Sequence, residues 1–200
     1  MVSQMFHDFK ANGRPIVLFT VAYVLSYQLQ RGVIFPLESQ LGWEITEKAS
    51  MLFLPAGVLL LSFYYLRLWF IPVVLVGRTA LYLQFWGQPL FVDALVQAVY
   101  LACWYPFLLR SFENAGWSVF GSTDRPSFTV TGVAIFQVMA TLGVSIFVTA
   151  QSLIIGQVNH DQAFQYVVHY LVGDVLGAMV VMYLFYLTAT AWFRLKTPDR

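Results

Sequence analysis

Long apolar runs, broken by very few charges, constrain the fold of this chain more than any other feature. Hydrophobic residues make up 59% of its 200 residues, and charged residues only 10%. Such runs are too long for the core of a soluble domain of this size, since about 20 apolar residues are enough to cross a bilayer. The sequence therefore predicts an all-α fold: a polytopic integral membrane helical bundle.

About six transmembrane helices are expected within a single domain of residues 1–200. Apolar periodicity and length place them at residues 15–30, 50–66, 69–86, 89–110, 128–156 and 163–194. The last two are longer than one crossing requires, so we expect them to tilt or to extend beyond the bilayer.

The distribution of Lys and Arg predicts the orientation of this bundle. With both termini in the cytoplasm, only Arg31 and Lys48 lie outside. The cytoplasmic side then holds Lys10, Arg14, Arg67, Arg110, Arg125, Arg194, Lys196 and Arg200. This asymmetry follows the positive-inside rule, so the prediction is an N-in, C-in topology.

Charged residues inside the predicted spans are the main candidates for a functional site. Arg78, Asp93 and Asp174 lie roughly 12, 6 and 16 Å from the outer ends of their helices, at 1.5 Å per residue. A buried charge costs several kcal/mol unless it is paired or faces water. All three residues fall in the outer half of the membrane, so we expect them to form a cluster in which carboxylates neutralise the guanidinium.

Three interpretations of this cluster remain open. It is a structural salt bridge that fixes helix packing, a polar pocket for a ligand or proton, or an arrangement in which Arg78 snorkels alone. Tyr170 shares a helix face with Asp174, whereas His169 does not. His169 is expected to be a packed neutral imidazole, and no histidine spacing predicts a metal site.

Two segments predict close approach of helices. Pro55 lies about one turn into the second predicted span, where it removes a backbone hydrogen bond and, with Gly57, permits a kink or a close contact. Gly173 and Gly177 form a GxxxG pattern, in which two glycines share a face and admit a neighbouring helix. Asp174 lies between them and is therefore presented beside a bare backbone surface.

The chain resembles the MASE1 family of integral membrane sensory domains, which occur at the N-terminus of bacterial histidine kinases and diguanylate cyclases. That family has an aromatic-x-Pro-x-Gly stretch in an early helix and a Gly-Asp-x-x-Gly stretch in its last helix. The matching residues here are Phe53, Pro55, Gly57, Gly173, Asp174 and Gly177. The chain departs from the family in having Leu54 where a proline is usual, in having fewer spans, and in lacking an output domain.

The resemblance implies a standalone sensory or accessory subunit in the bacterial inner membrane. It would contact membrane lipid and another membrane or signalling protein through its helices. Two alternatives remain: a small-molecule binding or transport component with a polar intramembrane pocket, and a purely structural subunit of a larger complex.

Other chemistry is not indicated by the sequence. No phosphate-binding loop, nucleophile elbow or HExxH motif is present, so we expect no enzyme activity and no cofactor. The net charge of +1 does not indicate a nucleic-acid partner. Cys103, the single cysteine, lies in an apolar setting and is expected to be a packing residue.

Overall fold

A computed structural model describes residues 2–43, 50–85, 91–117, 119 and 130–196 of the chain. Its described part contains helices and no strand, as the all-α prediction requires. The elements in order are α1 (Val2–Leu29), η1 (Gln30–Ile34), α2 (Phe35–Gln40), α3 (Leu54–Leu66), η2 (Arg67–Trp69), α4 (Phe70–Phe85), α5 (Phe91–Asn114), α6 (Val130–Ile154), η4 (His160–Gln162) and α7 (Ala163–Lys196).

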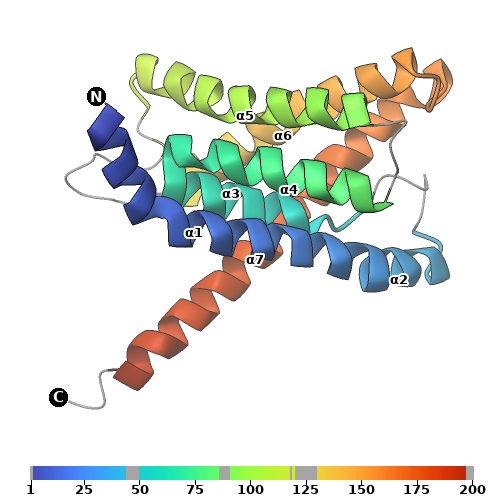
Figure 1. Cartoon of the computed structure of the whole chain (residues 1–200). Helices are drawn as coiled ribbons and strands as arrows, with labels where there is room; N and C mark the ends of the chain where they lie inside the picture. Colours follow the sequence, from blue (N-terminus) through green and yellow to red (C-terminus); the bar gives the residue numbers. More distant parts are fainter. Residues whose placement is uncertain (1, 44–49, 86–90, 118, 120–129, 197–200) are drawn as a thin grey trace.

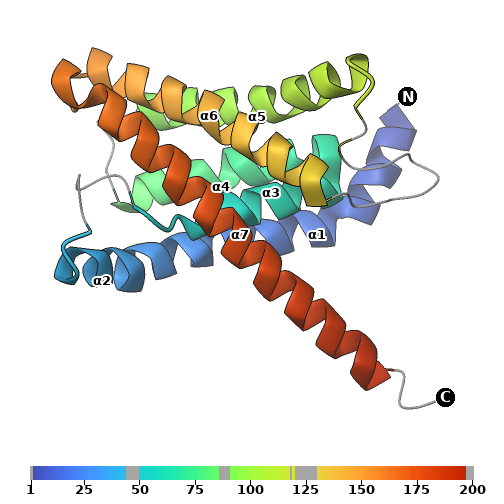
Figure 2. The same cartoon turned by 180° about the vertical axis from the view of Figure 1, so that it is seen from behind.

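The helices pack into one bundle with both chain ends at the same end of it (Figure 1). Helix α3 is central, because it packs against α1, α4 and α7, while α5 lies between α4 and α6. Helix α7 crosses the bundle diagonally, and its C-terminal half extends beyond the other helices (Figure 2). This extension agrees with the expectation that the last helix is longer than one crossing needs.

Four helical stretches are long and apolar enough to cross a membrane, which supports a multi-pass membrane protein. They are Leu54–Leu81, Phe91–Asn114, Thr131–Ile154 and His160–Trp192. The first stretch combines parts of two predicted spans and contains a break at Arg67, where φ is 52°. Helix α1, which contains the first predicted span, is not among the four. The six-pass topology is therefore not established by these lengths.

Pro55 begins α3 instead of kinking it. The helix starts at Leu54, so Pro55 occupies its first turn, where a backbone N–H has no intrahelical partner to lose. The predicted start of this span at residue 50 was too early, and of the two outcomes expected there, a kink or a close contact, the kink does not occur. The other expectation, a close helix contact at Gly57, agrees with the structure: a Cβ added there would lie 2.9 Å from the carbonyl oxygen of Gly177.

The core around α3 is built from aromatic rings. Phe63 packs its ring 5.3 Å from that of Phe70, 5.4 Å from that of Tyr105 and 5.6 Å from that of Phe136. These four residues come from α3, α4, α5 and α6, and all are buried. Contacts of this kind add to the burial energy of each ring, so Phe63 joins four helices at one point.

The outer surface of the bundle is apolar, as expected for helices in contact with lipid. Leu18, Leu68 and Val92, on separate helical segments, are each more than 60% exposed. Cys103 is also exposed on α5, so the prediction that it packs in the interior is wrong. Its neighbours Leu101, Ala102 and Tyr105 are buried on the face of α5 that packs in the core.

Candidate functional site

A cavity of about 60 Å³ lies inside the bundle, and residues from all seven α-helices line it. Its polar side chains include Arg78 from α4 and both Tyr170 and Asp174 from α7. Since each helix contributes to its wall, a change in the content of the cavity acts on the packing of the whole bundle.

Asp174 presents a buried carboxylate to this cavity. The residue is 7% exposed, and its Oδ1 atom has no hydrogen-bond partner. Burying a polar oxygen without a partner costs about 1–3 kcal/mol, and more for a charged group. The Arg78 guanidinium, on the wall of the same cavity, is close enough to interact electrostatically with this carboxylate. The structure thus brings two members of the predicted cluster, Arg78 and Asp174, to one site.

Arg78 is held by neutral groups from two other helices. One guanidinium nitrogen donates a hydrogen bond to the Tyr23 hydroxyl at 3.3 Å, and another donates to the Gln97 side-chain oxygen. Tyr23 and Gln97 are both buried, in α1 and α5 respectively. Sequence reasoning expected carboxylates here and did not identify either residue, because Tyr and Gln are polar without being charged.

Asp93 has a different partner from the one expected. The Gln151 amide, from α6, donates a hydrogen bond to the Asp93 carboxylate at 3.3 Å and another to its backbone carbonyl at 3.2 Å. Asp93 does not line the cavity that holds Arg78 and Asp174. The structure therefore separates Asp93 from the other two charges and places it between α5 and α6.

The two other candidates on α7 have different environments. Tyr170 lines the cavity, one turn before Asp174, as their shared helix face predicts. His169 is buried outside the lining, and its Nδ1 atom is 2.6 Å from the carbonyl oxygen of Gln165 in its own helix. This placement makes His169 a packing residue.

The glycines around Asp174 are in contact with the chain that enters α3. A Cβ on Gly173 would overlap the carbonyl oxygen of Ser50, and one on Gly177 would overlap that of Phe53. The Phe53 N–H donates a hydrogen bond to the carbonyl of Gly173 at 2.9 Å. The two segments that carry the MASE1 resemblance therefore touch each other directly.

A buried polar network, missed by sequence reasoning, holds the start of α3. The Glu38 carboxylate accepts hydrogen bonds from the Ser50 hydroxyl at 2.9 Å and the Leu52 N–H at 3.0 Å. The Gln30 amide donates to Ser50 Oγ at 2.7 Å and accepts from the Leu54 N–H at 3.1 Å. Glu38 lies beyond the first predicted span, which ends at residue 30, yet it is 6% exposed.

A π-helical turn explains how α1 reaches this network. Residues Gln30–Ile34 form a π-helix between α1 and α2, and such insertions rotate the following residues relative to a regular helix. Gln30 is fully buried at the start of this turn. The first predicted span ends at residue 30, so the sequence pattern predicted neither the continuation of the helix to Gln40 nor the burial of Glu38.

Loss of the Glu38 carboxylate is expected to destabilise the bundle. Glu38→Ala removes the two bonds to the carboxylate and leaves only the weaker 3.1 Å bonds between Ser50 and Leu52, at a cost of about 2 kcal/mol in unfolding free energy. Reversible unfolding in detergent micelles measures this loss. Glu113→Ala is the matched control, because Glu113 pairs with Arg110 on the exposed surface and should change stability by less than about 0.5 kcal/mol. Equal effects of both variants would contradict a stabilising role of the Glu38 hydrogen bonds.

Helix α6 carries a second polar feature that the sequence reasoning missed. Five buried polar side chains recur along one face at intervals of three or four residues: Gln137, Thr141, Ser145, Thr149 and Ser152. Some of them bond within the helix, as Gln137 does to Thr141 and Ser145 to the Thr141 carbonyl. Such bonds allow polar residues to be buried in a helix bundle without charge.

The described residues contain no group of three or more His, Cys, Asp or Glu side chains that could hold a metal ion. No protein-family model matches the chain, and neither a curated protein nor a solved structure is similar to it. The MASE1 resemblance therefore remains a prediction based on two segments, and the function must be argued from the cavity and its surroundings.

Proposed function

We propose that this protein is a membrane sensory or accessory subunit in which the state of the central cavity sets the packing of α7 against α3. The observation that carries the proposal is the position of Asp174. Its carboxylate faces the cavity, while the glycines on either side contact the backbone of residues 50–53. A ligand or proton that acts on Asp174 therefore acts at the point where α7 touches the start of α3.

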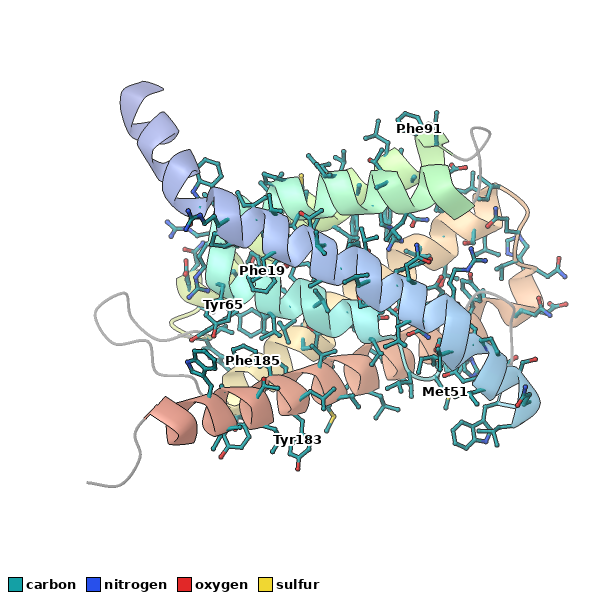
Figure 3. The ribbon with its side chains drawn as sticks, turned by 60° about the horizontal axis from the view of Figure 1, so that its bottom comes forward. Phe19, Met51, Tyr65, Phe91, Tyr183 and Phe185 are labelled. Carbon is teal, nitrogen blue, oxygen red and sulfur yellow. The ribbon has the colours of Figure 1, made fainter. Side chains whose placement is uncertain are left out.

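The C-terminal half of α7 transmits the change in helix packing away from the cavity. Tyr65 of α3 packs between Phe19 of α1 and Phe185 of α7, at ring distances of 5.9 and 5.8 Å (Figure 3). Beyond this contact α7 extends toward the C-terminus with its apolar side chains exposed, Tyr186 and Trp192 among them at 64% each. This exposed half is the surface that we assign to a partner membrane or signalling protein and to lipid.

The distance between η2, which follows α3, and the C-terminal half of α7 tests the coupling. Spin labels are placed at Leu68 and Tyr183, which are 67% and 62% exposed, in a chain whose Cys103 is replaced by Ser. We expect Asp174→Asn to shift or broaden the distance distribution measured by pulsed EPR in lipid nanodiscs. Asp93→Asn is the control and is expected to leave it unchanged, because Asp93 lies outside the cavity lining. An unchanged distribution in Asp174→Asn would remove the basis of the proposed coupling.

We also propose a six-pass, N-in, C-in topology in a bacterial inner membrane. Six helices are longer than α2: five of them run along the bundle (α1, α3, α4, α5 and α6), and α7 crosses it diagonally. Both chain ends lie at one end of the bundle (Figure 1). In this arrangement α3 and α4 cross separately, on either side of the turn at Arg67. The asymmetry of Lys and Arg supports the same orientation.

Cysteine labelling tests this topology directly. Gln40 and Ala115 are both exposed, and they lie at opposite ends of the proposed bundle. In a Cys103→Ser background, a membrane-impermeant maleimide applied to intact cells should label Gln40→Cys and should label Ala115→Cys only after the membrane is opened. Labelling of both positions from the same side would exclude the six-pass arrangement.

A binding or transport component is the second candidate, and the unsatisfied Asp174 Oδ1 atom in the cavity favours it. Co-purification and solute uptake together distinguish the two functions. A stoichiometric protein partner that depends on α7 supports the accessory subunit, whereas accumulation of a small solute in vesicles that contain only this chain supports transport.

A further inference from the structure

We propose that the central cavity binds a small zwitterion, of the size of glycine or alanine, between Asp174 and Arg78. This inference rests on the proposed function, because it identifies the ligand of the same cavity. It is carried by three features of the wall: opposite charges, aromatic side chains and a small volume.

The opposite charges on the cavity wall favour a dipolar ligand. Asp174 and Arg78 both line the cavity, so it contains one anionic and one cationic group. An isolated cation is attracted by the carboxylate and repelled by the guanidinium, and an isolated anion meets the reverse, in surroundings where such interactions are weakly screened. A zwitterion aligns its ammonium with Asp174 and its carboxylate with Arg78, and compensates both charges with no net charge transferred.

The Asp174 carboxylate has an open acceptor for the ammonium group. The residue is 93% buried, and its Oδ1 atom has no hydrogen-bond partner. An ammonium brings three N–H donors, one of which satisfies this oxygen directly. Arg78 is meanwhile fixed from outside the cavity by Tyr23 and Gln97, so the positive charge is held in place before a ligand arrives.

Aromatic rings form much of the remaining wall and favour the same ligand. Tyrosine and phenylalanine side chains from α1, α2, α5, α7 and the residue before α3 line the cavity, namely Tyr27, Phe35, Phe53, Tyr105 and Tyr170. The negative face of an aromatic ring attracts an ammonium group, and this attraction grows when water is excluded. A carboxylate surrounded by such rings is a setting that suits an amine better than a metal ion.

The volume limits the size of the ligand. One water needs about 10–15 Å³ of cavity volume, so a cavity of about 60 Å³ holds about four to six non-hydrogen atoms. Glycine and alanine fall in this range, whereas leucine, sugars and nucleotides exceed it. The packing residues Leu101 and Val148 close the apolar part of the wall and set this limit.

Equilibrium binding to the full chain in lipid nanodiscs tests the inference, with radiolabelled glycine as the probe. We expect saturable binding by the wild-type protein below about 10 mM glycine, competition by alanine, and none by leucine, acetate or methylammonium. Asp174→Asn and Arg78→Gln are each expected to weaken glycine binding at least about tenfold. Asp93→Asn is the matched control and should bind as the wild type does.

A second variant keeps the test valid if the charge variants fold poorly. Leu101→Ala enlarges the cavity without altering its charges, and it is expected to let valine compete for bound glycine. Failure of the folded wild type to bind glycine shows that the cavity holds water alone, and it overturns the inference. Equal competition by methylammonium shows a simple cation site and also overturns it. The proposed function fails separately, if Asp174→Asn leaves the Leu68–Tyr183 distance unchanged.

Discussion

Gly177→Ala is expected to lower the stability of the bundle by about 3 kcal/mol or more, a large effect for one added methyl group. The new Cβ would overlap the carbonyl oxygen of Phe53, and it would lie 2.9 Å from the backbone nitrogen of Leu54. These are backbone atoms at the start of α3, and they cannot move aside as a flexible side chain would. Helix α7 must instead shift away from α3, which weakens contacts along the most extensive helix interface of the bundle.

Gly173→Ala is expected to have a similar effect, because its Cβ would overlap the Ser50 carbonyl oxygen. It also strains the hydrogen bond from the Phe53 N–H to the Gly173 carbonyl. Thermal or SDS-induced unfolding in micelles measures both variants. The control is Gly13→Ala, since Gly13 lies in α1 with nothing within 4 Å of an added Cβ. This control should be neutral or slightly stabilising, by up to about 1 kcal/mol from helix propensity. Equal behaviour of all three variants would contradict the close packing of α7 on residues 50–54.

The sequence predicted this contact only in part. The sequence identified four residues that favour close approach of helices: Pro55, Gly57, Gly173 and Gly177. Glycine has no side chain to keep a neighbouring helix away, and proline lacks a backbone N–H. The partner surface was not predicted. The glycines of α7 pack against the non-helical residues 50–53, and only further along against α3 itself. A GxxxG pattern identifies a face of one helix but does not say what covers it.

The polar site shows the same limit. The apolar pattern located Arg78, Asp93 and Asp174 inside helices and estimated their depths, but the rotation of each helix about its axis decides which of them meet. The structure brings Arg78 and Asp174 to one cavity and turns Asp93 toward Gln151 of α6. Neutral residues were overlooked because a buried Gln or Thr carries no charge, and charge was the criterion that singled out candidates. Tyr23 and Gln97, which hold Arg78, belong to this group.

Arg78→Gln is the second substitution for which we expect a large loss, of about 3 kcal/mol in unfolding free energy. Removal of the guanidinium leaves the buried Asp174 carboxylate without the positive charge that shares its cavity, and breaking one partner of a buried charge pair typically costs about 3–5 kcal/mol. It also removes donors to Tyr23 and Gln97. Asp174→Asn is expected to cost a comparable amount, because it leaves the guanidinium uncompensated.

The double variant separates this coupling from independent damage. Arg78→Gln with Asp174→Asn leaves no isolated charge in the cavity, so the combined loss should be smaller than the sum of the two single losses by about 1–3 kcal/mol. The same cycle with Asp93→Asn is the internal control. The Asp93 carboxylate bonds to Gln151 outside the cavity lining, so its loss should add to that of Arg78 within about 0.5 kcal/mol. Additivity in the Asp174 cycle would show that Arg78 and Asp174 contribute independently to stability. Coupling in the Asp93 cycle would show that Asp93 interacts with Arg78 as the sequence predicted. Unfolding in micelles at one pH and one detergent concentration measures all of these variants on a common scale.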